Sequence, residues 1–116
     1  MFEVGVDCVN VSRLAGKTSS SKIFTQTEID YCQSKHRPLE HFAARFAAKE
    51  AVIKAISGFK SKYKLIDIEI LNNSSGKPYV KLNKKLPNNM SIKISLSHTS
   101  DVAIAMAIVY EVPVNI

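Results

Sequence analysis

The segment from 45 to 54 carries side chains that could act on a phosphate-bearing ligand. Within this alanine-rich stretch Glu50 and Lys54 stand four residues apart, which places a carboxylate and an ammonium group on one side of a helix. Taken alone, the pair is most typical of a helix-stabilising ion pair worth about 0.3–0.5 kcal/mol. Polar groups elsewhere in the chain make a chemical role the better interpretation.

Those other groups are spread from one end of the chain to the other. Asp7 lies near the N-terminus, Gly76-Lys77-Pro78 forms a turn in the middle, and His98 lies near the C-terminus. Two carboxylates, a lysine, a glycine-lysine turn and a histidine are together what a magnesium-dependent site for a phosphate-bearing ligand requires.

Each of these groups also has a purely structural interpretation. Asp7 could cap a helix or a turn, and Gly76-Lys77-Pro78 is first a hairpin turn whose lysine is solvated. His98 closes a strand with an apolar inward row, where a hydrogen-bonded core histidine is the more common outcome. Glu50 borders an apolar stripe, so its carboxylate must either find a cation or take up a proton; Lys54 or a metal would serve as the cation.

Length, composition and charge narrow the classes of protein that the chain can belong to. Its 116 residues predict a single domain over 1–116, and no apolar run approaches the roughly 20 residues that cross a bilayer. Sixteen Lys and Arg against ten Asp and Glu give a net charge of +6, which favours an anionic partner. The chain has no recognised nucleic-acid motif and no interleaving of aromatic with basic residues. We expect a cytoplasmic protein with neither a membrane nor a nucleic acid as partner.

Hydrophobic periodicity predicts the elements that must position the candidate residues. The fold class is α+β, an antiparallel sheet packed against a long alanine-rich helix. The six alanines of that helix would let either a ligand or another backbone approach closely. The expected elements are a strand over 2–9, a short helix capped by Thr25 or Thr27, the long helix over 39–56, a hairpin from 65 to 82, a strand over 92–96 and a central strand over 102–110.

Five ordered segments carry a resemblance to a known family, and together they span nearly the whole chain. They are Gly5-Val6-Asp7 with Arg13, Phe24 to Glu28, Arg45 to Ala51 with Lys54, Gly76-Lys77-Pro78, and Ser95 to Thr99. In this order and spacing the chain resembles the holo-acyl-carrier-protein synthase family of 4′-phosphopantetheinyl transferases.

The resemblance implies a reaction and a metal. The 4′-phosphopantetheine arm of coenzyme A would be transferred to a serine of apo acyl carrier protein, with release of adenosine 3′,5′-bisphosphate, in support of fatty acid biosynthesis. By this analogy Asp7, Glu50 and Lys54 are catalytic, Asp7 and Glu50 hold Mg²⁺, and Lys54 contacts the diphosphate. Either Glu50 or a metal-bound water could deprotonate the carrier serine.

The same resemblance assigns the rest of the coenzyme A site and an oligomeric state. By the resemblance, Arg45 and His98 belong to the 3′-phosphate end, Gly76, Lys77 and Pro78 belong to the nucleotide pocket, and Thr99 also contributes to the coenzyme A site. A helical wheel puts Arg45 about 140° from Glu50. A long bent ligand could touch both, or Arg45 could serve a neighbouring subunit's ligand. The resemblance also implies a homotrimer with its active sites at the subunit interfaces.

The basic charge would steer an acidic acyl carrier protein to the enzyme, and Arg13, Lys17 and Lys22 are the candidates for its docking surface. The alternative function is a basic, non-enzymatic module that binds nucleic acid or a carrier protein.

Overall fold

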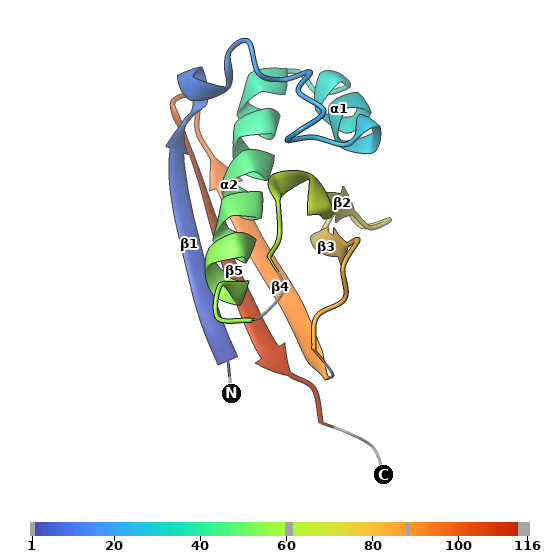
Figure 1. The fold of residues 1–116 in the computed structure, drawn as a ribbon. Helices are drawn as coiled ribbons and strands as arrows, with labels where there is room; N and C mark the ends of the chain where they lie inside the picture. The colour runs from blue at the N-terminus through green and yellow to red at the C-terminus, as the bar shows by residue number, and fades with distance from the viewer. Residues whose placement is uncertain (1, 60–61, 88, 114–116) are drawn as a thin grey trace.

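A long helix, α2, lies across one face of a three-stranded antiparallel sheet (Figure 1). The computed structural model describes residues 2–59, 62–87 and 89–113. The larger sheet has the order β1-β5-β4, and β2 pairs with β3 in a separate hairpin. The elements in chain order are β1 (Phe2–Asn10), η1 (Val11–Leu14), α1 (Gln26–Gln33), α2 (Pro38–Ile56), η2 (Leu65–Asp67), β2 (Ile68–Asn72), β3 (Pro78–Leu82), β4 (Met90–His98) and β5 (Val102–Glu111). The predicted α+β class and the central place of the last strand are confirmed.

The two α-helices begin where local sequence signals place them. Thr25 Oγ1 accepts a hydrogen bond from the Glu28 backbone N–H, and Glu28 Oε1 accepts one from the Thr25 N–H, so Thr25 is the cap of α1. Pro38 opens α2 at a position where its missing N–H costs no hydrogen bond. No helix in the described ranges combines the length and apolar character needed to span a membrane.

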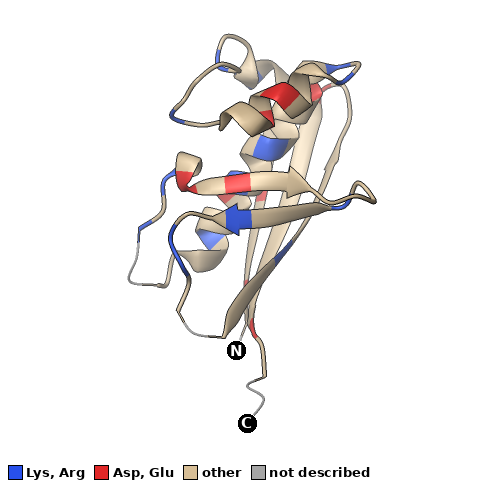
Figure 2. Cartoon of the chain, turned by 90° about the vertical axis from the view of Figure 1, so that its right-hand side faces the viewer, with Lys and Arg blue, Asp and Glu red and all other residues tan. Residues whose placement is uncertain are grey.

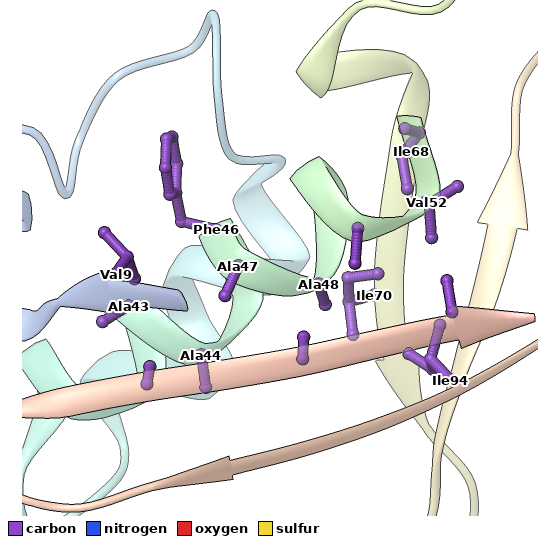
Figure 3. Packing of buried hydrophobic residues seen from close by; sticks show 14 of the residues in the cluster. Val9, Ala43, Ala44, Phe46, Ala47, Ala48, Val52, Ile68, Ile70 and Ile94 are labelled. Atoms are coloured by element: carbon purple, nitrogen blue, oxygen red, sulfur yellow. The ribbon is translucent and has the colours of Figure 1, made fainter. Parts of the chain in front are cut away.

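The alanines of α2 serve the contact with the sheet. All six are at most 3% exposed, and those labelled in Figure 3 lie between the helix and the neighbouring strands. The approach is closest at Gly5 of β1, where a Cβ atom would stand only 1.9 Å from the carbonyl oxygen of Ala51. Of the two interpretations of the alanines, close helix-on-sheet packing is therefore the correct one for the buried face.

The opposite face of the three-stranded sheet is open and apolar. Alternation along β1 and β5 directs one row of large side chains away from α2, and the register pairs Val6 with Met106 and Val4 with Ile108. Five of these side chains are more than 40% exposed, namely Phe2, Val4, Val6, Ile104 and Met106. We call these five residues the open apolar face; an exposed apolar patch of this kind is typical of an interaction surface.

The start of the predicted hairpin is wrong by three residues, since residues 65–67 form the 3₁₀ turn η2 and the strand begins at Ile68. Asp67 is the cause, because its carboxylate accepts hydrogen bonds from the Lys64 backbone N–H at 2.7 Å and from Asn83 Nδ2 at 3.0 Å. The Lys64 N–H is the main reason that the pKa of Asp67 is lowered. These side-chain bonds stabilise a turn where the apolar alternation alone indicates a strand.

The close approach at Gly5 yields a stability prediction. We expect Gly5→Ala to lower the free energy of unfolding by about 3 kcal/mol, because the added methyl group meets backbone atoms that cannot move without shifting α2. Gly58→Ala is the matched control, since a Cβ at Gly58 meets nothing within 4 Å, and its effect should stay within about 0.5 kcal/mol. Urea unfolding of the two variants beside the parent chain measures both; equal stabilities would contradict the packing described.

Candidate functional site

One group of predicted residues meets at the edge where β1 passes α2. Lys54 Nζ lies 3.2 Å from Asp7 Oδ1 and donates a hydrogen bond to the Val6 carbonyl oxygen at 2.9 Å. Glu50 stands one turn earlier on the same side of α2 and is half-buried, and its carboxylate has no ion pair or hydrogen bond with another described residue. Lys54 therefore pairs with Asp7 and not with Glu50, which leaves two carboxylates and one ammonium group at one edge.

A second group surrounds Arg45, which is only 3% exposed although it carries a permanent charge. Its guanidinium carbon lies 3.9 Å above the ring of Tyr31, and Nη2 donates a hydrogen bond to Asn72 Oδ1. Arg45 Nε is buried and has no hydrogen-bond partner among the described residues. A buried donor without a partner is costly, so this atom indicates a missing acceptor.

A cavity of about 360 Å³ adjoins Arg45. Its lining includes Tyr31, Lys35 and Gly76, so the predicted glycine turn does contribute to the same pocket as the buried arginine. Asn72 Nδ2 donates to the Gly76 carbonyl oxygen at 2.9 Å and thereby fixes this turn beside the arginine. Two cationic side chains, an aromatic ring and a shaped turn suit an anionic aromatic ligand such as a nucleotide.

His98 lies at the end of β4 beside the first turn of α2. Its Nδ1 is 3.0 Å from Glu40 Oε1, and its ring lies edge-on to that of His41 with centroids 4.9 Å apart. The His41 ring lies in turn 6.2 Å from that of Tyr31, so His98 is connected to the Arg45 group through two rings. The side chain of His98 is hydrogen-bonded, as the structural interpretation expects, but it is 27% exposed and therefore partly accessible.

The two groups lie on opposite sides of α2. Asp7 belongs to β1 and His98 to β4, the two edge strands, and the register places both on the face that α2 covers. Edge strands with one strand between them are roughly 10 Å apart. On α2 itself, Glu50 and His41 differ by nine residues, or about 180° of rotation. The residues Asp7, Glu50 and Lys54 and the residues around Arg45 therefore form two half-sites that lie apart within one chain. We call them the carboxylate half-site and the arginine half-site.

A buried ion pair that the sequence analysis missed connects the elements around the arginine half-site. Lys49 and Glu28 are both fully buried, with Lys49 Nζ 2.6 Å from Glu28 Oε1. Lys49 also donates to the carbonyl oxygens of Ile23 and Leu65, while Glu28 Oε2 accepts from the Ile70 N–H. Burial lowers the pKa of Lys49, and the charge of Glu28 opposes this shift. The pair joins α1, α2, η2 and β2, which carry Tyr31, Arg45 and Asn72.

The remaining predicted residues are dispersed. Arg13 lies 5.2 Å over the Phe46 ring, and Lys17 and Lys22 are exposed in the connection to α1. Lys77 and Pro78 line a separate cavity of about 260 Å³ between β3 and β4. Thr99 Oγ1 accepts the backbone N–H groups of residues 101 and 102, so its hydroxyl stabilises the β4–β5 turn. Figure 2 shows Lys and Arg positions distributed over several loops, α2 and the hairpin.

Comparisons with known proteins show which family the chain is similar to. The model of the 4′-phosphopantetheinyl transferase superfamily matches residues 3–107. The chain is similar to the holo-[acyl-carrier-protein] synthase of Thermodesulfovibrio yellowstonii, at 44% identity over 91% of this chain and 96% of that protein. It is also similar to that of Chlorobaculum parvum, at 42% identity over 93% and 97%. Among solved structures, the Chronobacterium ammoniagenes ACPS-CoA complex has a TM-score of 0.81, at 26% identity over 97% of this chain and 99% of that one.

The buried ion pair yields a second stability prediction. We expect Lys49→Met to lower the free energy of unfolding by about 3–5 kcal/mol, because it leaves the Glu28 carboxylate buried without its cation. Lys84→Met is the control: Lys84 pairs with Asp67 but is 49% exposed, so its loss should cost less than about 1 kcal/mol. Chemical denaturation followed by circular dichroism compares the two. A Lys49→Met chain as stable as the control would show that the pair does not hold these elements together.

Proposed function

The chain belongs to the 4′-phosphopantetheinyl transferase superfamily, and on that premise we propose that it acts as a holo-[acyl-carrier-protein] synthase. In this reaction the hydroxyl of a carrier-protein serine attacks the phosphorus that bears the pantetheine arm of coenzyme A. A new phosphorus–oxygen bond forms to the serine, the bond within the diphosphate breaks, and adenosine 3′,5′-bisphosphate leaves. The serine proton passes to a base. The product is a carrier protein with its phosphopantetheine arm.

The match over almost the full length of two such synthases, at 42% and 44% identity, carries this proposal. The arginine half-site supports it, because Arg45 and Lys35 give the adjoining cavity two cationic side chains and Arg45 Nε is a buried donor without a partner among the described residues. The alternative of a basic binding module without activity has no comparable support. The enzyme assignment therefore replaces it.

The carboxylate half-site suits Mg²⁺. Asp7 and Glu50 come from two elements that are packed together, and the Glu50 carboxylate has no other described partner. Hard oxygen ligands of this kind hold Mg²⁺ together with water and phosphate oxygens. When bound, the ion would neutralise charge on the diphosphate and on the leaving adenosine 3′,5′-bisphosphate. Lys54 is half exposed, so its ammonium group can exchange its contact with Asp7 for one with a phosphate oxygen.

A second copy of the chain would bring the two half-sites together. One chain keeps Asp7 and Arg45 on opposite sides of α2, and the open apolar face on the far side of the sheet is available for association. We propose a homotrimer in which Asp7, Glu50 and Lys54 of one subunit face Arg45, His98 and Gly76 of another. The helical wheel allows either one long ligand that touches both Arg45 and Glu50 or an Arg45 that binds the ligand of a neighbouring subunit. The proposed trimer favours the second.

The remaining assignments stay predictions. The exposed Arg13, Lys17 and Lys22 lie along the connection between β1 and α1, and we propose that this connection receives the acidic carrier protein. A single domain over 1–116, a role in fatty acid biosynthesis and a cytoplasmic location are further parts of the proposal.

The reaction and its metal can be tested together by intact-mass spectrometry of an acidic apo acyl carrier protein incubated with coenzyme A and Mg²⁺. We expect a mass increase of one phosphopantetheine, lost with EDTA and restored by excess Mg²⁺. Asp7→Asn and Glu50→Gln should each lower the rate by at least about 100-fold, because each removes an anionic ligand from the diphosphate end. Asp30→Asn, an exposed carboxylate on α1, is the control and should transfer at the parent rate.

Two results would contradict the assignments. Failure to modify any of several carrier proteins, with the chain shown to be folded, would contradict the synthase activity. Parental rates in Asp7→Asn and Glu50→Gln would leave the activity standing but remove these residues from the site.

A further inference from the structure

The carboxylate of Glu40 has an unusual place at the rim of the arginine half-site. It stands in the first turn of α2 and is only 13% exposed, and it contacts His98 Nδ1 at 3.0 Å and Arg37 Nη1 at 3.5 Å. A carboxylate in the first helical turn is favoured by the helix dipole, but that benefit does not require a histidine from a strand 58 residues away. The contact with His98 is therefore a specific feature of the tertiary structure.

The hydrogen bond between His98 Nδ1 and the Glu40 carboxylate determines which hydrogen bonds remain open to His98 Nε2. With Nδ1–H donating to Glu40, the ring of His98 is held in one orientation and Nε2 is its remaining polar atom. Nε2 makes no hydrogen bond to any residue in the described ranges. Both nitrogens donate at once in the protonated ring, with the Glu40 carboxylate as the acceptor on one side and a phosphate oxygen as the acceptor on the other.

The neighbouring histidine has the opposite character. Burial is the main reason that the pKa of His41 is lowered, and the charges of His98, Arg45 and Lys35 act in the same direction while that of Glu40 opposes them. Neutral His41 then serves as a wall against which the His98 ring is packed. Among the described residues, His98 has a carboxylate partner on Nδ1 and keeps Nε2 for a ligand, whereas His41 has no carboxylate partner.

Coenzyme A carries a diphosphate and a separate phosphate monoester on its ribose, so each half-site would bind one of them. The reacting diphosphate belongs with the carboxylates and Lys54, as proposed above, so the half-site with Arg45, Lys35 and His98 is left with the phosphate monoester on the ribose. We propose that Glu40 is a positioning residue for this 3′-phosphate: it holds His98 by Nδ1 so that Nε2 donates to the phosphate, and it thereby sets the preference for coenzyme A over 3′-dephospho-coenzyme A. This inference rests on the proposed function.

Equilibrium binding tests the proposal without the transfer reaction. Titration calorimetry with coenzyme A and with 3′-dephospho-coenzyme A gives the preference as a ratio of two dissociation constants. We expect Glu40→Ala to weaken coenzyme A binding by about 10-fold, the effect of one charge-assisted hydrogen bond, and to leave dephospho-coenzyme A binding unchanged. Glu40→Gln keeps an oxygen that can accept from Nδ1–H and should lose less of the preference. Glu111→Gln, an exposed carboxylate at the end of β5, is the control.

A double-substitution cycle separates positioning from general damage. In a His98→Ala background, Glu40→Ala should cause no further loss of coenzyme A binding, because Glu40 acts through His98. Equal weakening of both ligands would show a structural role, and an unchanged ratio in Glu40→Ala would overturn the proposal. If Glu40→Ala does not fold, the ratio in Glu40→Gln decides: it must lie between those of the parent and of His98→Ala. A parent chain that binds both coenzymes with this preference but transfers nothing would contradict the proposed function and not this inference.

Discussion

The contact between the backbone of α2 and the backbone of β1 is the constraint on which the rest of the structure depends. Gly5 has no side chain, and Ala51 and Ala55 present almost none, so the helix lies within contact distance of the strand. A helix this close to the sheet leaves no room for a ligand beneath it. Functional side chains can therefore project only from its two sides, toward β1 on one and toward β4, α1 and the hairpin on the other.

The second constraint is electrostatic. A lysine in the middle of a helix that is buried over most of its surface requires a partner, and Lys49 finds it in Glu28, whose carboxylate already caps α1 and accepts a hydrogen bond from β2. Separating the two charges of such a buried pair lowers the stability by more than the intact pair adds to it, because each charge would be left buried without a partner. The elements that supply the two residues are therefore held together. The cavity beside Arg45 lies between the same elements and takes its shape from their placement.

Features that depend on neighbouring residues could be predicted from the sequence. Contacts between residues far apart along the chain could not. A cap at Thr25 or Thr27, the start of the long helix near residue 39 and the apolar central strand are predicted from neighbouring residues. In the structure Thr25 is the cap, α2 begins at Pro38 and β5 is the central strand. The Glu28–Lys49 and Glu40–His98 contacts join residues that no short pattern connects. Lys54 illustrates the same limit, because the i, i+4 rule pairs it with Glu50 whereas the fold offers it Asp7. Alternation along β1 likewise cannot say which of its faces meets the helix.

The central claim is that each active site combines the carboxylates of one subunit with the arginine half-site of another. Mixing Asp7→Ala with Arg45→Gln chains under conditions that exchange subunits, and then measuring transfer at low coenzyme A concentration, tests it directly. Neither variant should be active alone, but random reassembly gives about a quarter of the sites two intact halves, with recovery of about that share of parental activity. A mixture of Asp7→Ala with Glu50→Ala, which damages the same half, should recover nothing. A first mixture that stays as inactive as its components, although tagged subunits are shown to have exchanged, would contradict the claim.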